Sequence, residues 1–222
     1  MSAHMQMEVM KLKKKILALT AVVKDAVERS IKSIVDRDAK LAQQIIDGDT
    51  EIDHAEVDIE EDCLKILALY QPVATDLRFV VGVLKINNDI ERVGDLAVNI
   101  AERALFLCSQ ERIGIPFDFA EMCNKALMML GQSLDGLMKM NADLARKVRA
   151  SDDEVDEINR QMYLKVGQAV RKNPEHVDRL LSYLSASRHL ERIADYATNI
   201  AEDVIYLIEG EIVRHKPTFP EA

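Results

Sequence analysis

The sequence predicts an all-α protein built as two tandem three-helix bundles. Three observations support this: long segments whose apolar residues recur with the helical period, few turn-forming residues, and an internal repeat offset by about half the length. The 222 residues include eight Gly, five Pro and no Trp, and 48% are hydrophobic. A β-sandwich needs many more turns. We therefore expect a first bundle at residues 1–112 and a second at 113–222, each long enough for a core.

The first three helices follow from the apolar period and its interruptions. One helix is expected at about 5–35, and the charged segment Asp36-Arg37-Asp38 marks the turn into a second helix that runs to Tyr70. Gln71-Pro72 ends this helix, because Pro lacks a backbone donor and restricts the residue before it. The third helix is expected at about 75–110.

The second half repeats this plan after a linker. Arg112-Ile113-Gly114-Ile115-Pro116 is the best linker in the middle of the chain, and Asn173-Pro174 is the counterpart of Gln71-Pro72. Long helices with short connections pack antiparallel in an up-down order. The three helices of the second half are expected at about 117–140, 142–172 and 175–209.

One helical segment occurs twice, 100 residues apart. Ile90–Glu102 and Leu190–Glu202 are identical at eight of thirteen positions, and the shared residues include Glu, Asp and Asn. The repeat continues upstream at an offset of 103, where Asp49 and Asp53 match Asp152 and Asp156. Packing of apolar residues does not explain why polar residues recur in register.

These polar residues form a candidate metal site in each half. With 3.6 residues per turn, Glu91, Asp95 and Asn99 share a helix face turned away from the apolar residues. The preceding helix adds two Asp one turn apart, so acids of both helices converge if the helices are neighbours. The candidate ligands are Asp49, Asp53, Glu91, Asp95 and Asn99 in the first half, and Asp152, Asp156, Glu191, Asp195 and Asn199 in the second.

Such a cluster favours a cation. Two carboxylates about 4 Å apart repel by about 4 kcal/mol at an effective dielectric constant near 20. Oxygen ligands favour hard or borderline ions such as Mg, Mn, Fe or Ca, and several acids on one face allow multinuclear binding. Glu56 and Glu60 enrich the first half, where Asn159 and Tyr163 stand in the second, so the two sites should differ in affinity. The alternative is a solvated helix face.

Composition and the absence of motifs restrict the function. A formal net charge of −9 argues against nucleic acid or an anionic membrane as the main partner. The three Cys form no C-x-x-C pair, and no apolar segment has the length of a signal peptide or a membrane span, so we expect a cytoplasmic protein. His54, His176 and His189 are weak candidates for carrying a phosphoryl group. No enzyme motif is recognisable, and we expect a non-enzyme.

Four motifs make the chain resemble the PhoU family of phosphate-transport regulators. They extend from the first Pro-containing turn to the end of the last helix and occur in both halves. The motifs are Gln71–Arg78 (QPVATDLR), Asp89–Asp95 (DIERVGD), His189–Glu202 (HLERIADYATNIAE) and Gly210–His215 (GEIVRH).

The resemblance implies a cytoplasmic adaptor, often a homodimer. It would link the ATPase subunit of the phosphate-specific ABC transporter to the sensor histidine kinase of the phosphate regulon, and it would reach the membrane only through these partners. With plentiful phosphate it would act as a negative regulator of uptake and of the starvation response. Its E(D)-x-x-x-D motifs would bind multinuclear Fe, Zn, Mn or Mg at the ten candidate ligands, with Asn99 and Asn199 the weaker ones.

The chain departs from the family where many members have His after the motif Asp. Leu96 and Tyr196 stand there and cannot replace an imidazole ligand, so a cluster would be smaller or weaker. Two further hypotheses remain beside the adaptor. A metal-dependent enzyme acting on a phosphorylated molecule is conceivable, because a carboxylate-bound metal can activate water. A scaffold whose acidic faces bind only solvent is the third.

Overall fold

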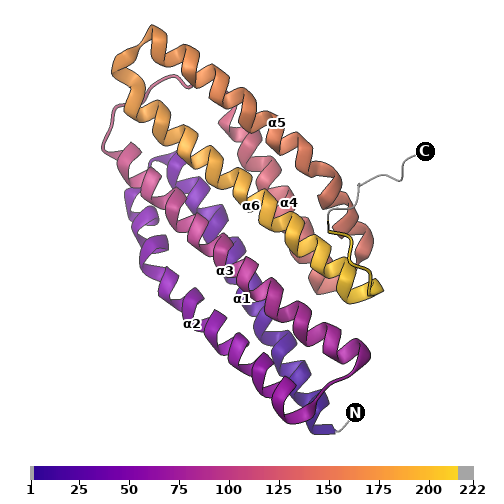
Figure 1. The fold of residues 1–222 in the computed structure, drawn as a ribbon. Helices are drawn as coiled ribbons and strands as arrows, with labels where there is room; N and C mark the ends of the chain where they lie inside the picture. The colour runs from indigo at the N-terminus through magenta and orange to yellow at the C-terminus, as the bar shows by residue number, and fades with distance from the viewer. Residues whose placement is uncertain (1–2, 215–222) are drawn as a thin grey trace, which may run out of the picture.

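The computed structural model describes residues 3–214, and the chain in that range is almost entirely helical (Figure 1). The predicted all-α class is confirmed, and each helix begins and ends within a few residues of its expected position. The elements are α1 (Ala3–Asp36), α2 (Ala39–Tyr70), α3 (Ala74–Cys108), α4 (Phe119–Lys139), α5 (Ala142–Lys172), the 3-10 turn η1 (Pro174–His176) and α6 (Val177–Glu209).

Side chains and special backbone conformations define the helix ends. Asp38 caps α2 by accepting a hydrogen bond from the Leu41 amide at 3.0 Å, and Asn141 caps α5 through the amides of Asp143 and Leu144. Such caps satisfy N–H groups that have no partner inside a helix. At the other end of α2, Gln71 adopts a left-handed conformation with φ 45° before Pro72. The chain therefore turns where the sequence predicts.

Two three-helix bundles lie side by side. The first contains α1, α2 and α3, and the second contains α4, α5 and α6; α3 packs against α6, and α1 also touches α4 (Figure 1). The contact between α3 and α6, which we call the α3–α6 seam, is antiparallel, since Lys85 near the start of α3 bonds Asp203 near the end of α6. The boundary expected at residue 112 lies in the connection 109–118 between α3 and α4.

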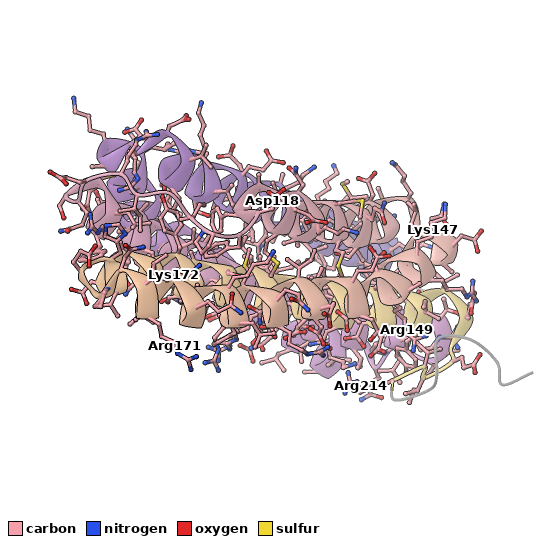
Figure 2. All side chains as sticks on the ribbon, turned by 90° about the horizontal axis from the view of Figure 1, so that it is seen from above. Asp118, Lys147, Arg149, Arg171, Lys172 and Arg214 are labelled. Atoms are coloured by element: carbon pink, nitrogen blue, oxygen red, sulfur yellow. The ribbon has the colours of Figure 1, made fainter. Side chains whose placement is uncertain are left out.

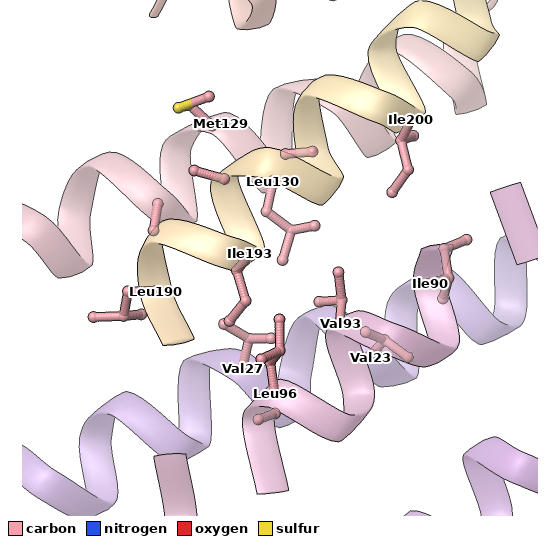
Figure 3. Close-up of a cluster of buried hydrophobic side chains, with 14 of the residues drawn as sticks. Val23, Val27, Ile90, Val93, Leu96, Met129, Leu130, Leu190, Ile193 and Ile200 are labelled. Carbon is pink, nitrogen blue, oxygen red and sulfur yellow. The ribbon is translucent and has the colours of Figure 1, made fainter. Parts of the chain in front are cut away.

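The hydrophobic core is shared by both bundles. It is one cluster with residues from all six helices, and each fully buried large aliphatic side chain contributes about 1.5–3 kcal/mol. At the α3–α6 seam, a Cβ added to Gly82 would lie 2.4 Å from Leu207 Cδ2, so any larger residue there would force the Leu207 side chain to move. Figure 3 shows side chains of four helices meeting: Val23 and Val27 of α1, Ile90, Val93 and Leu96 of α3, Met129 and Leu130 of α4, and Leu190, Ile193 and Ile200 of α6.

No helix among residues 3–214 combines the length and the apolar character needed to cross a bilayer. The apolar faces of the helices instead point into the shared core, which accounts for their amphipathic sequence.

Candidate metal centres on the two bundles

The first carboxylate stripe, which we define as Asp49, Asp53, Glu91 and Asp95, lies along the contact between α2 and α3. Each helix contributes two acids one turn apart, as the sequence predicts. Burial, followed by the charges of Asp53 and Asp95, raises the pKa of Asp49, so acids of the two helices face each other. Burial and the charge of Asp95 likewise raise the pKa of Glu91.

Two further acids of α2 continue this stripe. Burial, and then the charges of Glu60 and Asp53, raise the pKa of Glu56. The Oε1 atom of Glu56 also accepts a hydrogen bond of 3.1 Å from Nδ2 of Asn87 on α3. This bond ties the acidic face of α2 to its neighbour. The additional acids of the first half therefore lie on the same continuous surface as the first stripe.

Two oxygen atoms of the first stripe lack a hydrogen bond. Among the described residues, Oδ1 of Asp49 and Oε2 of Glu91 are buried without a hydrogen-bonding partner. Arg92 partly balances the charge, because its guanidinium lies 3.5 Å from Glu91 Oε2 and 3.4 Å from Asp95 Oδ2. An unsatisfied buried acceptor costs about 1–3 kcal/mol. The first stripe thus has acceptor capacity that a ligand can use.

The second carboxylate stripe, which we define as Asp152, Asp156, Glu191 and Asp195, lies along the contact between α5 and α6. Burial, followed by the charges of Glu191, Asp152 and Asp156, raises the pKa of Asp195 to about 6. Burial and the charge of Asp156 raise the pKa of Glu191 in the same way. Acids of α5 therefore act on Asp195 of α6 across the contact between the two helices, as an acid of α3 acts on Asp49 in the first bundle.

A hydroxyl group distinguishes the second stripe. Oγ1 of Thr198 donates a 3.0 Å hydrogen bond to Oδ1 of Asp152. In the repeat, Val98 occupies the place of Thr198, and Asp49 occupies the place of Asp152. Oδ1 of Asp152 thus has a hydrogen-bond donor in Thr198. The equivalent oxygen of the first stripe, Oδ1 of Asp49, has no partner among the described residues.

Comparison with known proteins decides the family. The model of the PhoU domain matches this chain twice, at residues 16–104 and at residues 119–204. The two matches cover both bundles and both stripes. The chain belongs to the PhoU family.

Similar proteins of the PhoU family extend over nearly the same length. An Aquifex aeolicus protein named phosphate-specific transport system accessory protein PhoU homolog is 37% identical, with 92% of each chain covered. The crystal structure of PhoU from Pseudomonas aeruginosa superposes with a TM-score of 0.89 at 34% identity, covering 93% of this chain and 99% of that one. A phosphate transport system regulatory protein PhoU from Streptococcus pneumoniae gives a TM-score of 0.82 at 28% identity, covering 94% and 99%.

The two candidate Asn differ in their surroundings within this PhoU-family fold. Asn99 donates its side-chain amide to the backbone oxygen of Asp95 at 2.9 Å. Asn199 instead lines a cavity at the α3–α6 seam, where it lies among residues of the first bundle. Directly after Asp95 and Asp195, Leu96 is buried in the core and Tyr196 is half-buried against it. Neither side chain offers a nitrogen ligand.

The structure contains a buried ion pair at the end of the second bundle that the helical periodicity of the sequence did not predict. Arg149 of α5 binds Glu202 of α6 at 3.2 Å, and only 10% and 11% of the two side chains are exposed. Arg214 approaches the other oxygen of Glu202 at 3.9 Å, and both Arg lie toward the same end of the molecule (Figure 2). Glu202 shares the helix face of Glu191 in sequence, but two cations already engage it. His215, the last residue of the PhoU motif, lies outside the described residues.

A cavity of about 660 Å³ opens where α2, α3 and α6 meet. Asp203, buried to 4% exposure, bonds Lys85 there and lies 3.9 Å from Arg214. Burial and the charge of Asp203 raise the pKa of Asp89 to about 6. The cavity is lined by Glu56, Glu60, Leu84, Lys85, Asn88, Asp89, Asn199, Asp203 and Arg214.

The donor chemistry of both stripes fits a hard metal ion. The side chains offer carboxylate oxygens, and Asp49 and Glu91 each offer a buried oxygen that has no hydrogen-bonding partner in the described part of the chain. Mg and Mn prefer such ligands, and Fe accepts them, whereas Zn more often takes nitrogen or sulfur. In the described range, no three His, Cys, Asp or Glu side chains stand in an arrangement that would hold an ion. Asp49, Asp53, Glu91 and Asp95, with their counterparts in the second stripe, are the residues that would bind one.

Proposed function

We propose that this chain is a negative regulator of phosphate uptake and of phosphate-starvation signalling. It would link the ATPase subunit of a phosphate-specific ABC transporter to the sensor histidine kinase of the phosphate regulon. The observation that carries the proposal is the match of the PhoU domain to both bundles. Support also comes from relatives that cover about nine-tenths of the chain and are named accessory proteins of the phosphate-specific transport system.

Complementation tests this role. The chain is expressed in a bacterium that lacks its own PhoU, together with the ATPase subunit and the sensor kinase from the source of this chain. We expect repression of a phosphate-starvation reporter in high phosphate, and copurification of the ATPase subunit or the kinase with the tagged chain. Derepression in high phosphate with no partner recovered, although the chain is folded and abundant, would contradict the proposal.

We further propose that the two stripes bind multinuclear metal, with Fe, Mn or Mg favoured over Zn. The support is that each bundle carries two acids on each of two contacting helices, and that neighbouring acids help to raise the pKa values of Asp49 and Asp195. A bound cation relieves the repulsion between like charges. Carboxylate side chains reach other rotamers readily, so an ion can draw the acids of each stripe together.

Elemental analysis of untagged protein purified without chelator tests metal binding. We expect stoichiometric metal in the wild type and its loss in the Asp95→Ala, Asp195→Ala double variant. The matched control is Asp47→Ala combined with Asp153→Ala, which removes two exposed acids from α2 and α5 outside the stripes. Equal metal in all three proteins would show that the ions bind elsewhere.

A further inference from the structure

The residues that follow α6 run back along the α3–α6 seam, and we call residues 210–214 the strap. The turn is made at Gly210, which has φ 74° and whose amide donates a 2.9 Å hydrogen bond to the backbone oxygen of Tyr206. A Cβ on Gly210 would lie 3.1 Å from Nη1 of Arg78 on α3, so the first bundle covers the start of the strap. From there the strap returns as far as Asp203.

The strap forms one wall of a cavity of about 220 Å³. Ile212, Val213 and Arg214 make up this wall, and the opposite walls include Val81 of α3 and Tyr206 of α6. Arg214 also lines the larger cavity of about 660 Å³. Its side chain therefore lies at the boundary of the two cavities.

The backbone of the strap has a firm anchor one residue before Arg214. Val213 packs partly buried against the core, and its backbone oxygen accepts a 3.2 Å hydrogen bond from Nη2 of Arg149. Nε of the same guanidinium binds Glu202 at 3.2 Å, and only 10% of the Arg149 side chain is exposed. Charges buried in this way are screened little by salt. The anchor at Val213 should therefore persist under conditions that weaken surface ion pairs.

The side chain of Arg214 is held much less firmly. Its Nε lies 3.9 Å from Oε2 of Glu202, and its Nη2 lies 3.9 Å from Oδ1 of Asp203. Both distances exceed the length of a hydrogen bond, so these contacts are electrostatic only. Because 47% of the Arg214 side chain is exposed, water and dissolved ions compete with them.

Departure of Arg214 would leave neither buried carboxylate without a cation. Glu202 keeps its bond to Arg149, and Asp203, whose side chain is 6% exposed, keeps its bond to Lys85. Removing the partner of a buried charge is strongly destabilising, so Arg149 and Lys85 must stay in place. Arg214 is a third cation beside two carboxylates that are already paired, and water can solvate its guanidinium when it leaves.

We propose that Arg214 is a gate between the two cavities of the α3–α6 seam. In the closed state its guanidinium lies beside Glu202 and Asp203 and separates the cavities. In the open state it turns to solvent, and the cavities join into one chamber. The Arg149 bond keeps the backbone of the strap in place, so the movement is confined to Arg214. Dissolved ions favour the open state by screening its two ion pairs.

A single fluorescent reporter in the smaller cavity tests the gate. The chain has no Trp, so Tyr206→Trp supplies one, and quenching by the neutral molecule acrylamide measures access to it. Raising NaCl to about 1 M, where the Debye length is about 3 Å, should increase the quenching constant by about twofold or more. Arg214→Gln in the same background should give a similar increase already at low salt, and added salt should then have little further effect.

Arg171→Gln is the matched control, because it removes the same charge from an exposed position of α5. It should leave both the low-salt quenching and the salt response unchanged. Urea denaturation checks that each protein is folded, and Val81→Trp on the facing wall replaces the reporter if Tyr206→Trp does not fold. Unchanged quenching in folded Arg214→Gln protein would overturn the proposal. A salt response as large in Arg214→Gln as in its parent, or an equal increase in Arg171→Gln, would overturn it as well.

Discussion

The two carboxylate stripes occupy equivalent places in the repeat, yet their surroundings differ. In the first stripe Oδ1 of Asp49 is buried without a hydrogen bond to any described residue, whereas in the second Thr198 donates to Oδ1 of Asp152. The first stripe continues into Glu56 and Glu60, and the second does not. A repeated backbone therefore places acids in the same arrangement, while neighbouring side chains decide how much charge remains to be neutralised.

The largest expected difference between the stripes is in metal affinity. The two stripes are disabled separately. Glu91→Gln with Asp95→Asn removes two charges from the first stripe, and Glu191→Gln with Asp195→Asn removes two from the second. We expect the protein that keeps the first stripe to bind Mn²⁺ about tenfold more tightly, because more acids of α2 lie within reach of the ion. Calorimetric titration of both variants measures the difference. Equal affinities would mean that Glu56 and Glu60 do not contribute.

The α3–α6 seam offers the next test, since its equivalent positions pack differently. Gly82→Ala should lower the free energy of unfolding by about 1–3 kcal/mol, because the new methyl group meets Leu207 at 2.4 Å. At the equivalent position, Ser182→Ala should be neutral or stabilising, since the buried Ser182 hydroxyl lacks a partner among the described residues. Urea denaturation measures both. Gly48→Ala is the control, because nothing lies within 4 Å of the added atom.

Asp89 of α3 and His189 of α6 occupy equivalent places in the repeat, yet they should respond oppositely to pH. Asp89 has its pKa raised from 3.8 to about 6, so its contribution to stability is full below about pH 4 and is lost as the pH rises through 6. Relative to Asp89→Asn, the wild type should lose on the order of 1 kcal/mol between pH 4 and pH 7.

The pKa of His189 is lowered from 6.5, so the folded state resists its protonation. The contribution of His189 is therefore present above pH 6.5 and is lost as the pH falls below that value. Unfolding free energies of the wild type, Asp89→Asn and His189→Gln across pH 4–8 give both slopes. Slopes of the same sign for Asp89 and His189 would contradict the opposite pKa shifts of the two residues.

The smallest expected effect comes from exchanging the residues that distinguish the stripes. Thr198→Val removes the hydrogen bond to Asp152 and should cost about 0.5–1.5 kcal/mol. Val98→Thr should supply the missing donor to Asp49 and stabilise the first bundle by a similar amount. Thermal unfolding in the presence of EDTA measures both without interference from metal. A loss of stability in Val98→Thr would show that Asp49 is not placed as Asp152 is.

Helical periodicity and chain breaks were sufficient to predict the helices and to place acids on pairs of helices that are neighbours in the structure. The apolar period places Glu91 and Asp95 on one face, and the repeated D-x-x-x-D pair indicates which neighbouring helix meets them. The same reasoning grouped Asn199 and Glu202 with the second stripe. In the structure Asn199 lines the seam cavity, and Glu202 is held by Arg149. A helical wheel gives the direction of a side chain but not the identity of the helix that it meets.

The sequence by itself determined the all-α class, the six helices, the duplication and the residues of each stripe, because these depend on local periodicity and short-range turn chemistry. Tertiary structure decided the rest. The core shared by all six helices and the cavity at the α3–α6 seam, where Lys85 binds Asp203, arise from contacts between residues about 100 positions apart. Such contacts depend on how two amphipathic helices slide and rotate against each other, which their individual periodicities leave open.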